Sequence, residues 1–346
     1  GKMAWLLQNT KNIDKVSHSD LCFGTIDSWL IYRLTGGKSF KTDFSNASRT
    51  QLFNIHSLEW DEDLCNWFEI PKMCLPEVCD SNAEFGRTDL EEFFPEEGSI
   101  HCVLGDSHAA LFGQGCHDIG MIKTTYGTGS SVMMNIGENF VDSKNGLVTS
   151  LAWGIDGKVT YVLEGNINYT GAVITWLKDD IKLIDEPNEL EEEAFSASKD
   201  DSTILVPAFS GLSAPYWNDN AKALICGMTR TTGKNELVRA ALDSIAFQIQ
   251  GVLAEMEKDS GIQIHELRVD GGPTRNKYLM QTQSNLSNVT VAISRVEELS
   301  ALGAVYLAGI SEGILDKRSI FTGRERVYYH PNMSADQREK KLNLWK

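Results

Sequence analysis

One acidic residue stands where a catalytic base could be held. Asp106 follows Gly105 at the end of a short apolar run over residues 100–104, and residues 109–112 after it favour a helix. A carboxylate at a strand-to-helix turn is held rigidly and can project into a cleft, which suits a general base. The same position suits a residue that caps a helix beginning near His108, and the spacing alone favours neither role over the other.

Two glycine-rich turns are candidate phosphate sites. Gly127-Thr128-Gly129-Ser130 forms the tip of a predicted hairpin over residues 120–134, and Gly271-Gly272 follows a predicted strand over 266–269. Glycine lets backbone amides approach a phosphate closely, and a threonine hydroxyl can donate to a phosphate oxygen. Ordinary hairpin turns use the same residues, so each turn alone is a weak signal. Neither turn is a Walker loop, because no Gly-Lys-Ser or Gly-Lys-Thr follows.

The other reactive side chains do not form a site by their spacing. His108 and His117 have no ligand partner three or four positions away, so a zinc site is not indicated. Ser107 lacks the Gly-x-Ser-x-Gly elbow of a serine nucleophile. The seven cysteines include no Cys-x-x-Cys pair and are interpreted as reduced thiols: Cys22, Cys65, Cys74, Cys79, Cys102, Cys116 and Cys226.

Composition indicates a folded protein that does not bind nucleic acid. The chain has 346 residues, enough for two domains, with 42% hydrophobic and 23% charged residues. Its formal net charge of -16 argues against nucleic-acid partners, which need clustered Lys and Arg. Nucleotide phosphates remain compatible with this charge, because backbone amides supply local positive potential. No apolar run reaches the roughly 20 residues of a membrane span, and we expect a cytoplasmic protein without a membrane partner.

The predicted elements alternate as in an α/β protein. A helix over 21–35 carries an apolar stripe expected to face the core: Phe23, Ile26, Trp29, Leu30 and Leu34. Acidic stretches over 57–98 and 185–201 are expected to be exposed, and a polar tail after residue 321 is expected to end in a helix. Further helices are predicted over 171–178, 234–258, 276–286 and 300–309, and strands over 100–104, 159–163, 203–207 and 266–269.

Several separate motifs together resemble the FGGY family of carbohydrate kinases, most closely its glycerol kinase branch. Gly-Asp at 105–106 with Ala-Ala-Leu-Phe-Gly-Gln at 109–114 resembles the family's catalytic-base segment. Thr-Tyr-Gly-Thr-Gly at 125–129 resembles its phosphate hairpin, and Val-Asp-Gly-Gly at 269–272 with Asn276 resembles its adenosine segment. Further matching segments lie at 2–9, 23–30, 42–50, 52–55 and 223–243.

The resemblance implies an actin-like (ribonuclease H-like) ATPase fold of two domains. Residues 1–115 would be the remainder of a substrate-side domain truncated at its N-terminus, and residues 116–346 a nucleotide-side domain. It further implies ATP and Mg²⁺ as cofactors and a small polyol or sugar as the partner, with homo-oligomerisation left open. The residue roles that it implies are Asp106 as the base, Ser107 and Ser131 at the acceptor, and Thr128, Gly171, Gly272 and Asn276 at the nucleotide.

The chain also departs from the family pattern. No counterpart of the family's first Asp-x-Gly-Thr phosphate hairpin is found, so the chain alone is expected to be inactive. Ser107 replaces a glutamine and Ser131 replaces an aromatic residue, which leaves a roomier and more polar pocket. The alternatives are therefore a kinase for xylulose, erythritol or a related polyol, or a non-catalytic actin-like ATP-binding module. The acidic segment 91–101 lacks the Arg-bearing loop that binds a sugar bisphosphate in bacterial members, so we expect no such inhibition.

Overall fold

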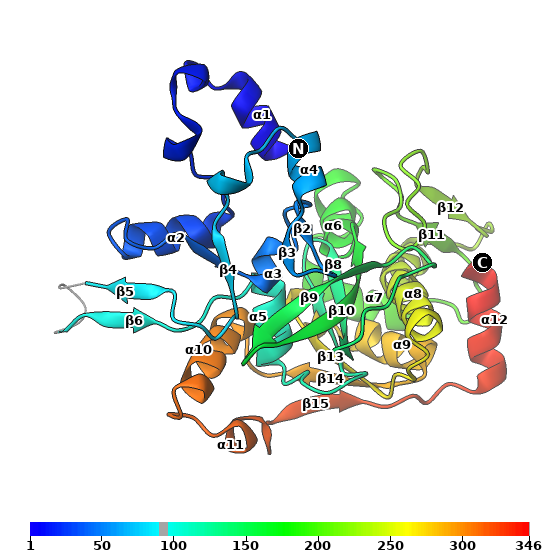
Figure 1. Ribbon diagram of the computed structural model, residues 1–346. Coiled ribbons are helices and arrows are strands. Elements are labelled where there is room, and N and C mark those ends of the chain that lie inside the picture. The colour runs from blue at the N-terminus through cyan, green and yellow to red at the C-terminus, as the bar shows by residue number, and fades with distance from the viewer. Residues whose placement is uncertain (90–95, 346) are drawn as a thin grey trace.

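The central element of the computed structural model is a seven-stranded mixed sheet (Figure 1). The structure describes residues 1–89 and 96–345. The predicted absence of an inhibitor-binding loop concerned residues 91–101, and residues 91–95 lie outside the described part. β13 pairs in parallel with β14 and β7, and the other neighbours pair antiparallel. In spatial order the strands are β15 (Arg326–Tyr329), β14 (Thr290–Ser294), β13 (Glu266–Asp270), β7 (Ile122–Tyr126), β8 (Ser130–Gly137), β10 (Lys158–Ile167) and β9 (Val148–Ile155).

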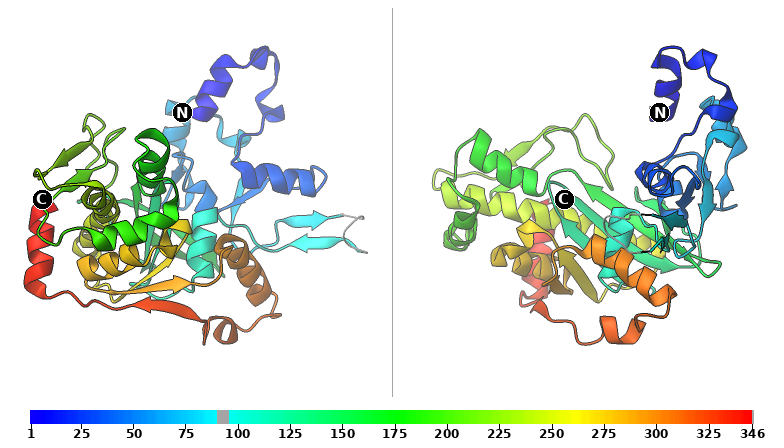
Figure 2. Two further views of the ribbon diagram at one scale, coloured as in Figure 1. Left: turned by 180° about the vertical axis from the view of Figure 1, so that it is seen from behind. Right: turned by 90° about the vertical axis from the view of Figure 1, so that its left-hand side faces the viewer.

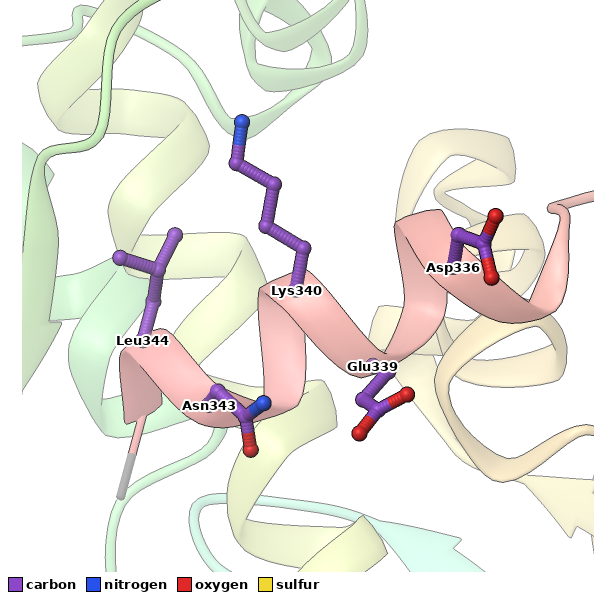
Figure 3. Close-up of a pocket in the computed structure, with 5 residues that line it drawn as sticks. All are labelled: Asp336, Glu339, Lys340, Asn343 and Leu344. Carbon is purple, nitrogen blue, oxygen red and sulfur yellow. The ribbon is translucent and has the colours of Figure 1, made fainter.

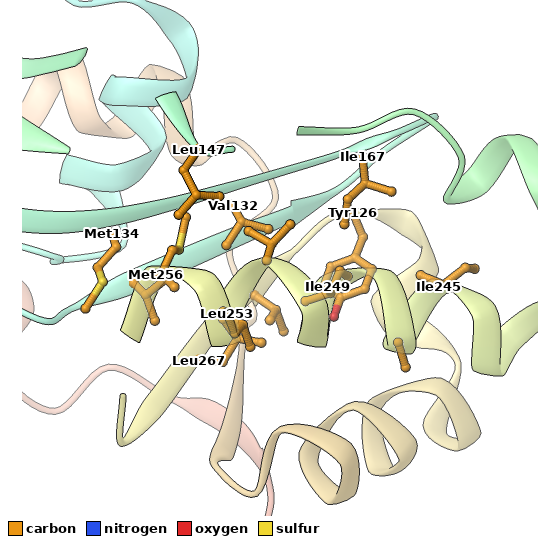
Figure 4. Close-up of a cluster of buried hydrophobic side chains, with 14 of the residues drawn as sticks. Tyr126, Val132, Met134, Leu147, Ile167, Ile245, Ile249, Leu253, Met256 and Leu267 are labelled. Atoms are coloured by element: carbon orange, nitrogen blue, oxygen red, sulfur yellow. The ribbon is translucent and has the colours of Figure 1, made fainter. Parts of the chain in front are cut away.

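Both faces of this sheet are buried, and successive residues of β8 pack to opposite sides. Met134 belongs to the larger hydrophobic core, beside the long helix α8 (Lys234–Ser260), as Figure 4 shows. Met133 belongs to a second core on the other face, with α5 (Asp106–Gly113) and α10 (Leu299–Ser311). Each fully buried large apolar side chain contributes about 1.5–3 kcal/mol. Helices on both faces of a largely buried sheet confirm the predicted α/β class.

The remaining elements of the C-terminal part surround this core. β11 (Ile204–Val206) and β12 (Leu224–Cys226) form a small antiparallel sheet. A π-helical turn spans Trp176–Asp180, and 3-10 turns span Pro187–Glu189 and Gly272–Arg275. The other helices are α6 (Gly171–Thr175), α7 (Leu190–Ser196), α9 (Lys277–Ser287), α11 (Lys317–Phe321) and α12 (Ala335–Trp345).

The N-terminal part consists of short elements that lie along one side of the large sheet (Figure 2). Its strands form three pairs: β1 (Lys41–Asp43) with β4 (Glu77–Cys79), β2 (Phe53–Asn54) with β3 (Glu59–Trp60), and β5 (Gly86–Thr88) with β6 (Gly98–Ile100). Its helices are α1 (Lys2–Asn9), α2 (Ile26–Leu34), α3 (Phe44–Ala47) and α4 (Glu62–Trp67), with 3-10 turns over Ile13–Lys15, His18–Asp20 and Lys72–Cys74.

The predicted core stripe of α2 is wrong. Ile26 is 71% exposed, Trp29 55% and Leu30 51%, whereas the buried residues of this helix are Ser28 and Ile31. Ile31 belongs to a small core on the opposite side of the helix. The spacing of apolar residues predicted the helix correctly. The face that carries Trp29 and Leu30 is exposed among the described residues, and the opposite face packs against the protein.

Most predicted elements are confirmed, with differences at their ends. The hairpin is β7 and β8, and the predicted helices over 171–178, 234–258, 276–286 and 300–309 correspond to α6 with its π turn, α8, α9 and α10. The strand predicted over 100–104 is wrong for most of its length, because β6 ends at Ile100. The tail ends in helix α12 as predicted, but β15 precedes it and joins the edge of the large sheet.

One helix among the described residues, α8, is long and apolar enough to cross a membrane by length and composition. Its most apolar window is 72% buried inside the protein, and the core helix of a folded domain passes the same test. The buried position of α8 between β8, β10 and α9 accounts for its composition.

Candidate active site

The turn before Asp106 is held by both parts of the chain. The carboxylate of Asp43 caps α3 by accepting from the backbone N–H of Asn46 at 3.0 Å, and it accepts from the Ser45 hydroxyl at 2.7 Å. The Ser45 hydroxyl oxygen in turn accepts from the backbone N–H of Gly105 at 2.8 Å. From α10, the Ser300 hydroxyl donates to the carbonyl oxygen of Asp106 at 2.9 Å. The backbone that carries Asp106 is therefore fixed from two directions.

Asp106 does not serve as the cap of α5. Gly105 occupies the cap position, and Asp106 is the first residue of the helix. Its carboxylate oxygen Oδ1 accepts only from the neighbouring N–H of Ser107, at 2.6 Å, among the described residues, and the side chain is exposed. The structure thus leaves the carboxylate free to receive a proton, which is the first of the two roles that the sequence left open.

A cavity of about 490 Å³ opens in front of Asp106. One side is formed by α2, α3 and the residues after it, and the other by α5, α10 and the strands β8 and β10. Its polar side chains come from both parts of the protein. They are Asp27, Asn46, Arg49, Asp106, Ser107, His108, Ser131, Glu164, Asn166 and Ser300.

A second cavity, of about 280 Å³, adjoins the first at the hairpin between β7 and β8. It is lined by Thr125, by Gly127 and Gly129 of the hairpin tip, and by residues of β8 and β10. Ser107, Ser131 and Asn166 line both cavities. The structure therefore brings the predicted acceptor residues Ser107 and Ser131 to the junction between the space in front of Asp106 and the hairpin.

The hairpin tip is clamped to the start of α6 by backbone hydrogen bonds. The N–H of Gly171 donates to the carbonyl of Gly127 at 2.9 Å, and the N–H of Ala172 donates to the carbonyl of Thr128 at 3.0 Å. A Cβ atom at Gly171 would lie 2.7 Å from the Gly127 oxygen, so a side chain does not fit there. Thr128 is exposed at the tip. The predicted nucleotide residues Thr128 and Gly171 thus belong to one local structure.

The turn after β13 lies against the other side of the hairpin. Gly271 has φ +101°, and a Cβ atom there would lie 2.0 Å from the carbonyl oxygen of Tyr126, so this position requires glycine. A Cβ at Gly272 would meet no atom within 4 Å. Asn276 caps α9, where its Oδ1 accepts from the N–H of Leu279 at 2.9 Å, a structural role that the sequence analysis did not assign. Gly272 and Asn276 therefore lie on one short turn next to β7.

A buried glutamate in the wall of the large cavity was missed from the sequence. The carboxylate of Glu164, on β10, accepts from Arg49 Nη1 at 2.8 and 2.9 Å and from the Ser150 hydroxyl. His108 Nε2 lies 3.8 Å from Glu164 Oε1, and burial lowers the pKa of His108 to about 4. A glutamate in the middle of a strand gave no local signal, because its arginine partner lies 115 positions earlier in the chain.

A buried lysine beside the hairpin was also missed. Lys123, on β7, is fully buried, and its Nζ donates to the hydroxyl of Thr125 at 3.0 Å. Desolvation lowers the pKa of Lys123, and the charges of Asp270 and Glu164 oppose that shift. Among the described residues no carboxylate lies within 4.0 Å of this ammonium group. Its hydrogen bond is to Thr125, a residue that lines the hairpin cavity.

A third hollow lies on the outer surface of α12 and contains none of the predicted site residues (Figure 3). Its lining consists of α12 side chains alone: Asp336, Glu339, Lys340, Asn343 and Leu344. No group of three or more His, Cys, Asp or Glu side chains that could hold a metal ion occurs within residues 1–89 and 96–345. The cavity in front of Asp106 and the adjoining hairpin cavity contain predicted site residues and together form the candidate active site.

Comparison with known protein families gives two matches that together cover most of the chain. The N-terminal domain of the FGGY family of carbohydrate kinases matches residues 1–113, and the C-terminal domain of that family matches residues 122–312.

Curated proteins of similar sequence include glycerol kinases from several bacteria. The glycerol kinase of Brevibacillus brevis is 47% identical over 348 aligned residues, which cover 100% of this chain and 70% of that protein. The glycerol kinase of Alkaliphilus oremlandii is 45% identical, with 100% of this chain and 69% of that protein covered. The chain thus spans about 70% of the length of these relatives.

Solved structures show the same fold. Plasmodium falciparum glycerol kinase with ADP superposes with a TM-score of 0.92 and 37% sequence identity, covering 99% of this chain and 69% of the other. A xylulose kinase from Lactobacillus acidophilus superposes with a TM-score of 0.85 at 22% identity, again over 99% and 69%. At that identity the second likeness concerns the fold alone.

Proposed function

The chain belongs to the FGGY family of carbohydrate kinases, and from this membership we propose a mechanism in which Asp106 is the general base. The family, its actin-like ATPase fold and the glycerol kinase relatives make the protein an ATP-dependent kinase of polyols or sugars. The observation that carries the proposal is the exposed carboxylate of Asp106, which lines the larger of two adjoining cavities that share Ser107, Ser131 and Asn166.

On the acceptor side, a hydroxyl of the polyol or sugar lies in the larger cavity. Asp106 accepts its proton as the hydroxyl oxygen attacks the terminal phosphorus of ATP and the bond to the leaving ADP oxygen breaks. Ser107 and Ser131 hydrogen-bond the acceptor at the junction. The fixed turn at Gly105, held by the Ser45 hydroxyl, keeps the base in place during the reaction.

On the donor side, the hairpin between β7 and β8 binds the phosphates. The hydroxyl of Thr128 donates to a phosphate oxygen, and the glycine backbone lets the N–H groups of the tip approach it. Gly171, Gly272 and Asn276 line the adenosine site, where the open space at Gly272 is consistent with close contact to a ligand. The buried ammonium group of Lys123 lies behind this cavity, where it donates to the hydroxyl of Thr125, a residue of the cavity wall.

Mg²⁺ fits this site as an ion carried by the nucleotide. The described residues contain no group of side chains that would enclose a metal ion, whereas Asp106 offers one exposed carboxylate in the larger cavity. Magnesium in kinases is held mainly by phosphates and water with one or two carboxylates. When bound, it neutralises charge on the transferring phosphates.

We further propose that residues 1–115 form the acceptor-side domain and residues 116–346 the nucleotide-side domain. We also propose a cytoplasmic location and no nucleic-acid or membrane partner.

The test is acceptor-dependent release of ADP by the complete protein. We expect ADP release to rise at least tenfold when a suitable polyol is added, with a phosphorylated polyol as the second product. ADP release that does not depend on any polyol or sugar would show an ATPase or a binding module instead of a kinase.

A further inference from the structure

We propose that Gln114 is a positioning residue, which joins the helix that carries Asp106 to the turn that carries Gly272. Through its side-chain amide, a nucleotide bound at this turn fixes the position of the base. The inference rests on the proposed function, because it concerns the two sides of the same site.

The side chain of Gln114 connects two charged groups at the end of α5. Its Nε2 donates to Oδ2 of Asp270 at 3.0 Å, and its Oε1 accepts from Arg326 Nη1 at 3.1 Å. A carboxylate can only accept and a guanidinium can only donate, so one orientation of the amide satisfies both partners. Gln114 is fully buried and Asp270 is 8% exposed, so the loss of this hydrogen bond would leave a buried polar group without a partner.

Asp270 is the last residue of β13 and directly precedes the proposed adenosine turn. Among the described residues, its carboxylate accepts a hydrogen bond from Gln114 alone. The next residue, Gly271, has no room for a side chain, because its backbone packs on the carbonyl oxygen of Tyr126. A displacement of Asp270 therefore displaces the turn and its contact with the hairpin.

The other end of the connection is a short, buried helix. α5 has eight residues and is therefore about 12 Å long, and residues 108–113 are all buried. Its backbone packs directly on α10, because a Cβ atom at Gly113 would overlap the carbonyl oxygen of Leu299. Close-packed elements of this kind transmit displacement along their length. A displacement at Gln114 therefore reaches Asp106, the first residue of the helix.

Other side chains hold the end of α5 without using this amide. Arg268 donates to the carbonyl oxygens of Gln114 and Gly115, at 3.0 and 2.8 Å. Arg324 donates to the carbonyl oxygen of Gly113 at 2.5 Å. Positive charge is favourable at the C-terminal end of a helix, where the last carbonyls lack partners within the helix. The helix end is therefore capped independently, and the Gln114 amide has the separate role of contacting β13.

The test compares variants of the complete protein. Gln114→Met removes the amide and keeps an unbranched side chain of similar length. Gln114→Glu keeps an acceptor for Arg326 but places a second carboxylate against Asp270. The double variant, Gln114→Glu with Asp270→Asn, restores a hydrogen bond in the reverse direction at the same net charge. Arg324→Met, which removes a donor to α5 and leaves the Gln114–Asp270 hydrogen bond in place, is the matched control.

The first measurement is amide hydrogen exchange of residues 106–116 and 125–131, with and without Mg-ADP. We expect Mg-ADP to slow exchange by about three- to tenfold in both segments of the unmodified protein and of Arg324→Met. In Gln114→Met and Gln114→Glu it should slow exchange over 125–131 only. The double variant should regain the response over 106–116. This measurement needs no acceptor.

Steady-state kinetics give the second measurement, with whichever of glycerol, erythritol, xylitol and xylulose is phosphorylated fastest. Gln114→Met should lower kcat by about tenfold, because the base is held less well against the phosphate, and should change the KM for ATP by less than about twofold. The double variant should recover most of the lost kcat. Arg324→Met should unfold at a lower temperature and keep its kcat.

Other results separate the inference from the proposed function. An equal response of residues 106–116 to Mg-ADP in folded Gln114→Met and in the unmodified protein would overturn the inference and leave the kinase intact. A loss of kcat that Arg324→Met reproduces would do the same. The expected exchange pattern without phosphate transfer would support the role of Gln114 and contradict the proposed function. No response to Mg-ADP in either segment of the unmodified protein would contradict both. If Gln114→Met does not fold, Gln114→Glu and the double variant provide the same comparison.

Discussion

Asp106 was predicted as a candidate base from the sequence, whereas the residues that hold its turn were not predicted. Its turn depends on the Ser45 hydroxyl and on Ser300, which lie 60 and 194 positions away. Spacing along the chain describes only local neighbours, so it left the capping and catalytic roles equally open. The hydrogen bonds of the folded chain favour the catalytic role, because Gly105 takes the cap position.

Lys123 provides a test at the level of one side chain. We expect Lys123→Met to fold, since a buried ammonium group is replaced by an apolar side chain of similar length. Its kcat should fall by about 10- to 100-fold, because the donor that bonds Thr125 behind the proposed phosphate cavity is lost. Steady-state kinetics with a thermal unfolding control measure both effects. Thr125→Val, which removes the hydroxyl that contacts Lys123, should lower kcat in the same direction. An unchanged kcat in folded Lys123→Met would contradict this role.

His108 makes stability depend on pH. Its folded-state pKa of about 4 lies below the ordinary value of 6.5, with burial as the main cause. Between these values the unfolded chain binds the proton and the folded chain does not, so the free energy of unfolding falls as pH decreases from 6.5 toward 4. The loss from this residue should be on the order of 2 kcal/mol. Urea unfolding at pH 7 and pH 5 measures it.

His108→Gln supplies the comparison for this pH dependence, because glutamine is polar and does not titrate. The variant should lose less stability between pH 7 and pH 5 than the unmodified protein. His117, whose pKa burial lowers to about 3, contributes in the same direction in both proteins. Equal slopes for the two proteins would show that His108 is not held neutral by the fold.

At the scale of elements, two adjacent glycines should behave differently. Gly272 lies beside open space, so Gly272→Arg should fold and weaken ATP binding by filling the space that the nucleotide needs. Gly271→Ala should instead destabilise the fold, because its Cβ would overlap the Tyr126 carbonyl and its φ is positive. Calorimetry with an ATP analogue and thermal unfolding separate the two effects. Unchanged nucleotide affinity in folded Gly272→Arg would place the adenosine site elsewhere.

The elements with strong local patterns were predicted, and those that depend on distant partners were not. The hairpin of β7 and β8 was found because apolar strands flank a glycine-rich tip. β15 was missed because its sequence, Arg-Val-Tyr-Tyr, lies in a polar tail. It is a strand because it pairs with β14, and Arg326 donates to Gln114 at the end of α5. The packing side of α2 was predicted wrongly for the same reason, since period alone does not identify the partner.

For the whole molecule, the fold class and the family followed from the sequence, whereas the arrangement of the candidate site required the fold. The family resemblance rested on motifs at both ends of the chain, and the comparisons confirm it. The junction of the two cavities combines Ser107 from α5 with Ser131 and Asn166 from neighbouring strands. Asn166 carries no motif of its own. Only the register of β8 and β10 places it beside Ser131.

The central claim is that this protein transfers phosphate from ATP to a polyol or sugar with Asp106 as the base. The most direct measurement is single-turnover phosphoryl transfer by Asp106→Asn in the complete protein, with Asp118→Asn, an exposed residue outside both cavities, as the matched control. We expect Asp106→Asn to bind ATP normally and to transfer phosphate about 10²- to 10⁴-fold more slowly, while Asp118→Asn keeps its rate. Transfer by folded Asp106→Asn within a few-fold of the unmodified protein would contradict the account.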